Sequence, residues 1–569
     1  MMNDAIAGNI DLSAVFDLYT YLDDAVVGHN YENQKLGDII DDLHLRAQSG
    51  DSTLTADQKN CIELIRGALN EHNEWGDAVL KDRSTIDANG MPSVTWTDDS
   101  VQAATFQYGD DYYVSFRGTG DGRWTDNSMG MKEITPMQEA ARGYFDSVVE
   151  RFGLENSSGD IYLGGHSKGG NEAQYCMLSS KYGGLVKAVY SIDGQGFPPE
   201  VVEQLKSMYG EDEYKARLAR MYSICGENDP VHQVIGPVIS PENTYYLPQS
   251  GGGIVGWHDM KYLFGQEVNG KWEYTGLQWQ KTGDEYDHGS PQASALFAAG
   301  LYNMLKKLDP EMRTSISKGL MGFIDLLTGT NLSDPNDRAT LGDYWNFLVH
   351  GVPMIGMELF FTPEGNKMLQ DLILMLENSM VDKLGPVAGT IVTAIIVGAA
   401  EIILVPLLLT WTLLGTLFEN SIVYQAFVLA TTVALAVFAI ALKKIIDIVK
   451  GIFDLVGNII DGIVSFFKKH SYAYKYCNNN PGISLNTDTL ESYARKLNSL
   501  NNRLQNVEYR IKRLYDQVDL LDKSWVQGAD MRIGSSGRLR KSRDYLNYAA
   551  SEFRNAEKSI NNKIAEVFG

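Results

Sequence analysis

A serine lies between two glycines at the spacing typical of a nucleophile on a sharp turn. Residues 165–169 read G-H-S-K-G, follow an apolar strand pattern and precede a helical pattern. A serine at such a strand-to-helix turn has strained backbone dihedrals, and small residues two positions before and after it let the backbone pass closely. Gly165 and Gly169 fill those positions, and the backbone N–H of Lys168 at the helix start is placed to bind an oxyanion. Because the chain has 55 glycines in 569 residues, a plain glycine-rich turn is the alternative to Ser167 as nucleophile.

A nucleophilic serine needs an imidazole as general base and a carboxylate that orients the imidazole. In hydrolases built on this turn, the acid and then the histidine follow the serine in the chain. The acid candidates are Asp193 and Asp229, both of which follow apolar runs. The alternative role for each is that of a turn residue, and for Asp229 also that of a helix cap before Pro230.

The base candidates after the serine are His232, His258 and His288. His232 is only three residues from Asp229, too near in sequence to approach the serine from the other side. His166 adjoins the serine and is expected to point away from it. The residues alone leave His258 and His288 open, each alternatively a surface or core histidine.

Strands and helices alternate around these candidates. Residues 103–108 and 112–116 read as a hairpin around a G-D-D turn, and the apolar runs 185–192 and 221–225 read as further strands. This alternation predicts a mainly parallel sheet with loops gathered at the carboxyl ends of its strands, where catalytic groups converge. We therefore expect an α/β domain over residues 1–330.

The motifs in their order resemble those of class 3 (fungal-type) lipases and their bacterial lipase-like relatives, over about residues 85–300. They are F-R-G-T at 116–119 with Trp124 and Asp126, G-H-S-K-G-G at 165–170, N-D-P-V at 228–231, and His258. D-G-Q-G-F at 193–197 resembles the bacterial branch, which has proline where this chain has Gln195. Lys168 replaces the usual leucine, which is expected to change the charge at the mouth of the site.

The resemblance implies an α/β-hydrolase fold and ester hydrolysis through an acyl-enzyme. Ser167 would be the nucleophile, His258 the base and Asp229 the acid, with Asp193 and His288 in reserve. The oxyanion would be bound by the backbone N–H groups of Thr119 and Lys168, with the Thr119 hydroxyl as a further donor. Such a mechanism needs no cofactor and no metal ion.

Composition narrows the class of partner and the compartment. A net charge of −23 argues against a nucleic-acid partner. Four scattered cysteines, with no C-x-x-C and no Cys/His ligand spacing, indicate neither a disulfide framework nor a zinc site. Residues 1–12 lack a basic segment followed by an apolar core, so we expect a cytoplasmic protein or one exported without a cleavable leader.

Residues 331–470 are predicted to form an all-helical, apolar region. Nearly continuous apolar runs at 387–400, 402–418 and 423–442 reach the span of a bilayer core, and a buried hairpin is the alternative. An amphipathic stripe over 445–467 fits either a membrane interface or a cover for that hairpin.

Residues 471–569 are predicted to form an antiparallel helical hairpin. Apolar residues follow a heptad seam over 490–521 and a second one over 539–567, separated by a glycine-containing turn. With W-V-Q-G at 525–528, this tail resembles the WXG/LXG-type targeting domains of type VII secretion, although the spacing is one residue longer and the domain is C-terminal. A generic coiled-coil dimerisation element is the alternative.

Together these features predict a lipase, more narrowly a phospholipase, exported by the type VII route to act on membranes as an effector. The resemblance implies a lipid or phospholipid substrate, small helical WXG-like chaperones on the hairpin, and an immunity protein. The alternatives are a non-catalytic membrane-associated scaffold with a hydrolase-like binding domain, and an intracellular membrane esterase.

Overall fold

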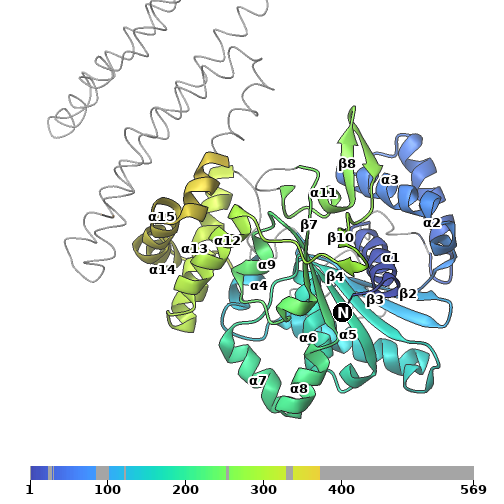
Figure 1. The fold of residues 1–569 in the computed structure, drawn as a ribbon, viewed down its shortest axis with the longest axis horizontal. Coiled ribbons are helices and arrows are strands. Elements are labelled where there is room, and N and C mark those ends of the chain that lie inside the picture. Colours follow the sequence, from blue (N-terminus) through green and yellow to red (C-terminus); the bar gives the residue numbers. More distant parts are fainter. Residues whose placement is uncertain are drawn as a thin grey trace, which may run out of the picture. The chain divides into compact units, whose positions relative to one another are not determined.

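The computed structural model describes residues 2–22, 29, 31–84, 102–120, 124–251, 256–328, 337–371 and 428. The chain divides into two compact units, Met1–Leu376 with Leu407–Thr432, and Glu377–Pro406 with Val433–Gly569. All described residues belong to the first unit (Figure 1).

A seven-stranded mixed sheet forms the centre of the first unit, and its strands lie side by side in chain order. The first three strands pair antiparallel, and the third to the seventh pair parallel. The sheet contains β1 (Val79–Arg83), β2 (Ala103–Tyr108), β3 (Asp111–Phe116), β4 (Ile161–His166), β5 (Val186–Ile192), β6 (Met221–Gly226) and β7 (Thr244–Leu247). The predicted α/β class is thus confirmed, and the predicted hairpin is β2 and β3, joined by Gly109 and Asp110.

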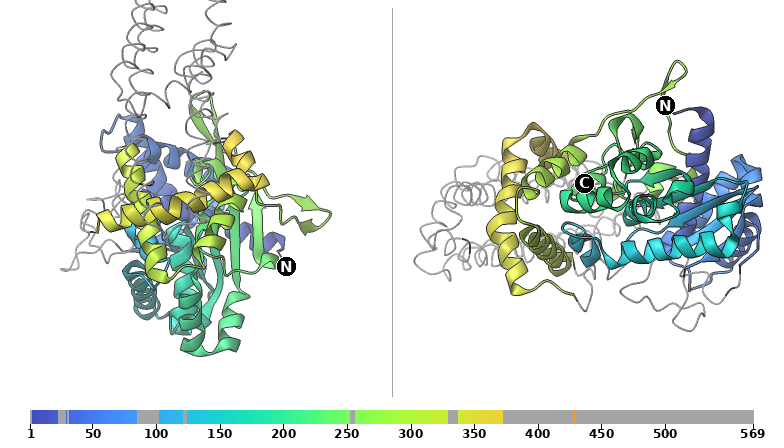
Figure 2. Two further views of the ribbon diagram at one scale, coloured as in Figure 1. Left: turned by 90° about the vertical axis from the view of Figure 1, so that its left-hand side faces the viewer. Right: turned by 90° about the horizontal axis from the view of Figure 1, so that it is seen from below.

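Helices cover both faces of this sheet, one face with helices that connect the parallel strands and the other with helices that precede the sheet in the chain. One face carries α5 (Pro136–Phe152), α6 (Lys168–Ser179), α7 (Pro199–Tyr209) and α8 (Glu211–Leu218). The other face carries α1 (Asp4–Thr20), which packs on four strands, with α2 (Leu36–Gln48) and α3 (Ala56–Glu71) against it. Figure 2 shows α1 and α5 on opposite sides of the strands.

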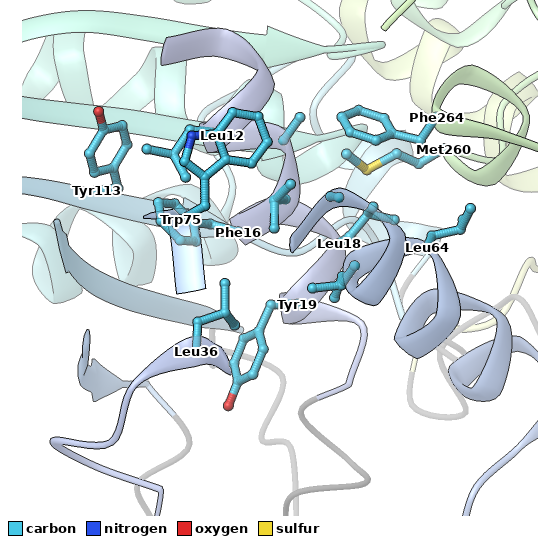
Figure 3. Close-up of a cluster of buried hydrophobic side chains, with 14 of the residues drawn as sticks. Leu12, Phe16, Leu18, Tyr19, Leu36, Leu64, Trp75, Tyr113, Met260 and Phe264 are labelled. Carbon is cyan, nitrogen blue, oxygen red and sulfur yellow. The ribbon is translucent and has the colours of Figure 1, made fainter. Parts of the chain in front are cut away.

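Each face has its own apolar core. The core under α1 to α3 includes side chains from the N-terminal helices, the strands and α11 (Lys261–Phe264), and Figure 3 shows part of it. Phe16 of α1 stacks on Phe106 of β2 with ring centroids 4.4 Å apart. The second core joins α5 and α6 to the opposite face of β3, β4 and β5. Because the central strands are buried on both faces, the sheet is a rigid support for the loops at its carboxyl edge.

Smaller elements follow the sheet in the chain. Helix α13 packs on α4 and α14, and α12 packs on α9 and α15. These elements are α4 (Trp124–Met129), α9 (Val231–Val234), α12 (Ala293–Leu305), α13 (Pro310–Thr328), α14 (Leu341–Asn346), the π-helical turn η5 (Phe347–Gly351) and α15 (Val352–Phe361), besides the hairpins β8 (Gly265–Val268) with β9 (Lys271–Tyr274) and β10 (Lys281–Thr282) with β11 (Glu285–Tyr286). Short 3-10 turns are η1 (Asn73–Asp77), η2 (Leu154–Asn156), η3 (Gly183–Leu185) and η4 (Pro241–Asn243).

The predictions for the apolar runs at 387–442 and for the hairpin at 471–569 fall almost entirely outside the described residues. Within the described part of the chain, every helix is too short or too polar to cross a bilayer. The membrane and secretion interpretations of those segments stay predictions.

Candidate functional site

Ser167 occupies a sharp turn between β4 and α6. Its φ of 59° and ψ of −123° place a non-glycine residue in a strained region. A Cβ atom on Gly165 would lie 2.3 Å from the carbonyl carbon of Gly169, and one on Gly169 would lie 2.0 Å from the carbonyl oxygen of Phe116. Side chains at either glycine would therefore push the turn apart. Helix α6 begins at Lys168, directly after the turn.

Ser167, His258 and Asp229 form one chain of hydrogen bonds. The Oγ of Ser167 is 2.7 Å from Nε2 of His258, and Nδ1 of His258 is 2.8 Å from Oδ1 of Asp229. With Nδ1–H donating to the carboxylate, Nε2 is left to accept the serine proton. The side chain of Asp229 is fully buried, whereas that of His258 is 16% exposed to solvent.

Asp229 follows β6, at the carboxyl edge of the sheet, and its carboxylate is held from two sides. The backbone N–H groups of Val231 and His232 donate to it over 3.2 and 3.0 Å. Nδ1 of His232 lies 3.1 Å from Oδ2, the oxygen that His258 does not use. Burial alone would raise the pKa of Asp229, but the two imidazoles lower it below its usual range. The carboxylate is thus ionised, and it caps the turn at α9 while it orients His258.

The two reserve residues differ in position, because Asp193 lies beside Asp229 and His258 whereas His288 bonds to the backbone of β7. Asp193 ends β5 with a positive φ of 48° and accepts the N–H of Gly226 over 2.7 Å. Burial and the negative charge of Asp229 raise the pKa of Asp193 well above its usual range, which favours its neutral form. His288 bonds through Nδ1 to the carbonyl of Thr244 and stacks on Tyr245, with ring centroids 4.4 Å apart. The structure brings neither residue into the chain of hydrogen bonds that ends at Ser167.

His166 packs beside His258 without bonding to the serine. Their ring centroids are 4.8 Å apart, and Nδ1 of His166 is 2.6 Å from the hydroxyl of Tyr21. Burial, with a smaller contribution from His258, lowers the pKa of His166 to about 3. His166 is therefore neutral, and its Nδ1 can accept a hydrogen bond from the Tyr21 hydroxyl. Tyr21 had no sequence signal, because it follows α1, far from the motifs.

The Lys168 side chain does not reach the mouth of the site, so the expected change of charge there is wrong. Its Nζ lies 2.6 Å from Oδ2 of Asp126 and 3.3 Å from Oγ1 of Thr135, and the side chain is 0% exposed. The ion pair ties the first residue of α6 to α4. The backbone of Lys168 keeps its place at the helix start, beside Ser167.

Thr119, the second predicted oxyanion residue, is held through two amide side chains. Nδ2 of Asn127 donates to Oγ1 of Thr119 over 2.9 Å, and Nε2 of Gln195 donates to Oδ1 of Asn127 over 2.7 Å. Since the Thr119 hydroxyl accepts a bond, its own proton is free to point at an oxyanion. Sequence reasoning missed Asn127 and noted Gln195 only as a departure from the bacterial pattern.

Among the described residues, two clusters could in principle hold a metal ion. They are His166, Asp193 and His258, and Asp193, Cys225 and His232, each with its ligand atoms within 4.8 Å of one another. Both His258 nitrogens and Nδ1 of His232 already bond within the chain that ends at Ser167. We therefore assign both clusters to that hydrogen-bonded network.

A cavity of about 580 Å³ lies between α4 and α13. Its lining is mostly charged and contains none of Ser167, His258 and Asp229. It therefore offers no apolar groove for an acyl chain beside the serine.

Comparison with known proteins gives a family match and distant structural likenesses. A search of curated proteins found no match. Among solved structures, a fungal lipase–inhibitor complex described as a model for interfacial activation is 11% identical, with 44% of this chain and 80% of that chain covered and a TM-score of 0.26. The Rhizomucor miehei lipase propeptide complex is 11% identical over 41% of this chain and 64% of that chain, with a TM-score of 0.24. The family model named Mbeg1-like matches residues 95–315, a stretch that holds β2 to β7 and all of Ser167, Asp229 and His258.

Proposed function

We propose that this protein is a serine carboxylic-ester hydrolase of the lipase type. The observation that carries the proposal is the continuous chain from Ser167 through His258 to Asp229, with bonds of 2.7 and 2.8 Å on a strained turn. The Mbeg1-like match over the same residues supports it.

In this proposal the Oγ of Ser167 attacks the ester carbonyl while Nε2 of His258 takes its proton. Asp229 stabilises the imidazolium that forms. The N–H groups of Thr119 and Lys168 and the Thr119 hydroxyl bind the oxyanion. His258 then returns the proton to the leaving alcohol, and water, activated by the same imidazole, releases the acid from the acyl-enzyme.

Replacing the serine tests the proposal directly. Ser167→Ala should abolish hydrolysis of a short-chain p-nitrophenyl ester and labelling by a fluorophosphonate, because the variant lacks the hydroxyl that bonds to His258 and forms the acyl-enzyme. Ser207→Ala is the matched control, since Ser207 is exposed and donates only to the carbonyl of Gln204. Equal labelling of Ser167→Ala and the parent would overturn the assignment and favour the non-catalytic scaffold.

The base is tested by a pair of histidine variants. His258→Ala should lose turnover, whereas His288→Ala should keep it, since His288 bonds to the backbone of Thr244. The opposite pattern would give the base role to His288.

We further propose that the substrate is a lipid ester, more narrowly a phospholipid, and that the protein is a type VII-secreted effector. The support is the sequence of residues 331–569, with its apolar runs and heptad seams. A panel of head groups and chain lengths tests the substrate. Deleting residues 481–569 and assaying the culture medium tests export, and unchanged export would exclude a targeting role for the tail.

A further inference from the structure

The carboxylate of Asp229 serves two histidines, of which the proposed reaction uses one. His258 bonds to Oδ1, while His232 bonds to Oδ2 through Nδ1 at 3.1 Å and through its backbone N–H at 3.0 Å. The side chain of His232 is 2% exposed, so solvent screens its interaction with the carboxylate little.

The second ring nitrogen of His232, Nε2, also faces groups that can accept a hydrogen bond from an N–H at this position. Its Nε2 lies 2.9 Å from the side-chain amide of Gln233 and 3.4 Å from the hydroxyl of Tyr246. The amide can present its oxygen to this nitrogen, because the two ends of an amide are interchangeable by a half turn. The pocket therefore accommodates an imidazole that carries protons on both nitrogens.

Burial favours the neutral form of most other titratable groups around the two rings. Burial raises the pKa of Cys225 and of Tyr246, which lie beside His232. The raised pKa of Asp193 and the lowered pKa of His166 both favour the neutral form. On the solvent side of His258, Asp259 is paired with Lys261 at 3.0 Å. The single negative charge of Asp229 thus faces both imidazoles.

We propose that His232 is a positioning residue that acts as a permanent imidazolium on Oδ2 of Asp229. Its positive charge weakens the attraction of this carboxylate for a proton on His258. The inference rests on the proposed function. Its consequence is that His258 stays unprotonated, and able to take the serine proton, at a lower pH than a histidine with an unshared carboxylate.

The balance of forces on His232 agrees with this geometry. Burial lowers the pKa of His232, whereas the hydrogen bond and the negative charge of the Asp229 carboxylate raise it. An imidazolium next to the carboxylate also explains why a fully buried Asp229 is ionised.

The pH dependence of kcat/KM tests the inference, with a p-nitrophenyl ester as substrate and the full chain as enzyme. His232→Gln keeps a donor toward Asp229 but removes the charge, so the midpoint of the acid limb should rise by about one pH unit. His288→Gln, outside the network, should leave the midpoint unchanged. A merely structural loss would lower the plateau of the profile without moving its midpoint.

A second readout needs no activity. In protein labelled with ¹⁵N-histidine, one ring should show two protonated nitrogens at pH 8, and that signal should be missing in His232→Gln. An unmoved acid limb, or a neutral His232 ring at pH 8, would overturn the inference while leaving ester hydrolysis intact. Loss of the proposed function itself would appear instead as unchanged turnover in Ser167→Ala.

Discussion

Lys168 illustrates how one charged residue can be structural beside a reactive serine. Its ammonium is buried and paired with Asp126, so removing one partner leaves the other charge without compensation. We expect Lys168→Leu to lower the free energy of unfolding by about 3–5 kcal/mol. Urea denaturation followed by fluorescence measures this.

The matched control removes both charges. Lys168→Leu with Asp126→Asn should recover most of the loss, because no unpaired charge stays buried. A double variant as unstable as the single one would mean that packing, not charge, explains the effect.

Asn127 should matter for the rate more than for substrate binding. Without its bond to the Thr119 hydroxyl, the proposed oxyanion donor is no longer fixed in direction. Asn127→Ala should therefore lower kcat by about tenfold to a hundredfold, with KM changed little. Steady-state kinetics on a p-nitrophenyl ester checks this split. The control is Asn243→Ala, since Asn243 is half-buried and its amide donates to the carbonyl of Ala219. A rise in KM alone would argue against a role at the oxyanion.

At the scale of single residues, the sequence predicted the candidate site where a motif has a fixed local conformation. Ser167, Asp229 and His258 were chosen from motifs, and the structure brings these three together. The direction of the Lys168 side chain was not predictable, since it depends on where the chain places Asp126, some forty residues earlier. Such long-range pairs leave no local pattern.

Helix α1 is an element whose stability should depend on pH. Asp11 on α1 accepts the indole N–H of Trp279 over 3.0 Å, and burial raises its pKa to about 7. A carboxyl group with a raised folded pKa stabilises the fold below its unfolded pKa of 3.8, and this contribution is lost as the pH rises to about 7. We expect the ionisation of Asp11 to make the free energy of unfolding about 2–4 kcal/mol lower at pH 8 than at pH 4.

Asp11→Asn removes this dependence, since an amide keeps the oxygen that Trp279 uses and cannot ionise. Urea unfolding at pH 5 and pH 8 should show a smaller difference between the two conditions for the variant than for the parent. Equal differences would assign the pH dependence to other groups.

Helix α1 also shows why some elements escaped prediction. It is buried on nearly all sides, from Leu12 to Thr20 without a break, so it lacks the polar face that gives an amphipathic helix its periodicity. The hairpin of β2 and β3 was predicted correctly because its turn residues and strand pattern are local. Strand β1 pairs with β2 across a long stretch of chain and has no turn signal of its own.

At the scale of the whole molecule, the proposed chemistry is confined to the first part of the chain. Ser167, His258, Asp229, Thr119 and the side chains that hold them all lie within residues 2–371. Deleting residues 471–569 should therefore leave kcat and KM of the purified protein within about twofold for a soluble p-nitrophenyl ester, since the described side chains that hold the site all belong to residues 2–371. The same deletion in Ser167→Ala gives the background, and a large loss of turnover would show that the tail supports the hydrolase.

The two glycines that flank Ser167 have a consequence for interpreting other chains. Gly165 and Gly169 are required because neighbouring backbone atoms leave no room for a Cβ, and this holds whether or not position 167 reacts. An inactive descendant with another residue at 167 would need the same glycines to keep its sheet and α6 together. The glycines therefore indicate the conformation of the backbone. The residues at positions 167, 229 and 258 are the ones that distinguish an active hydrolase from an inactive protein with the same fold.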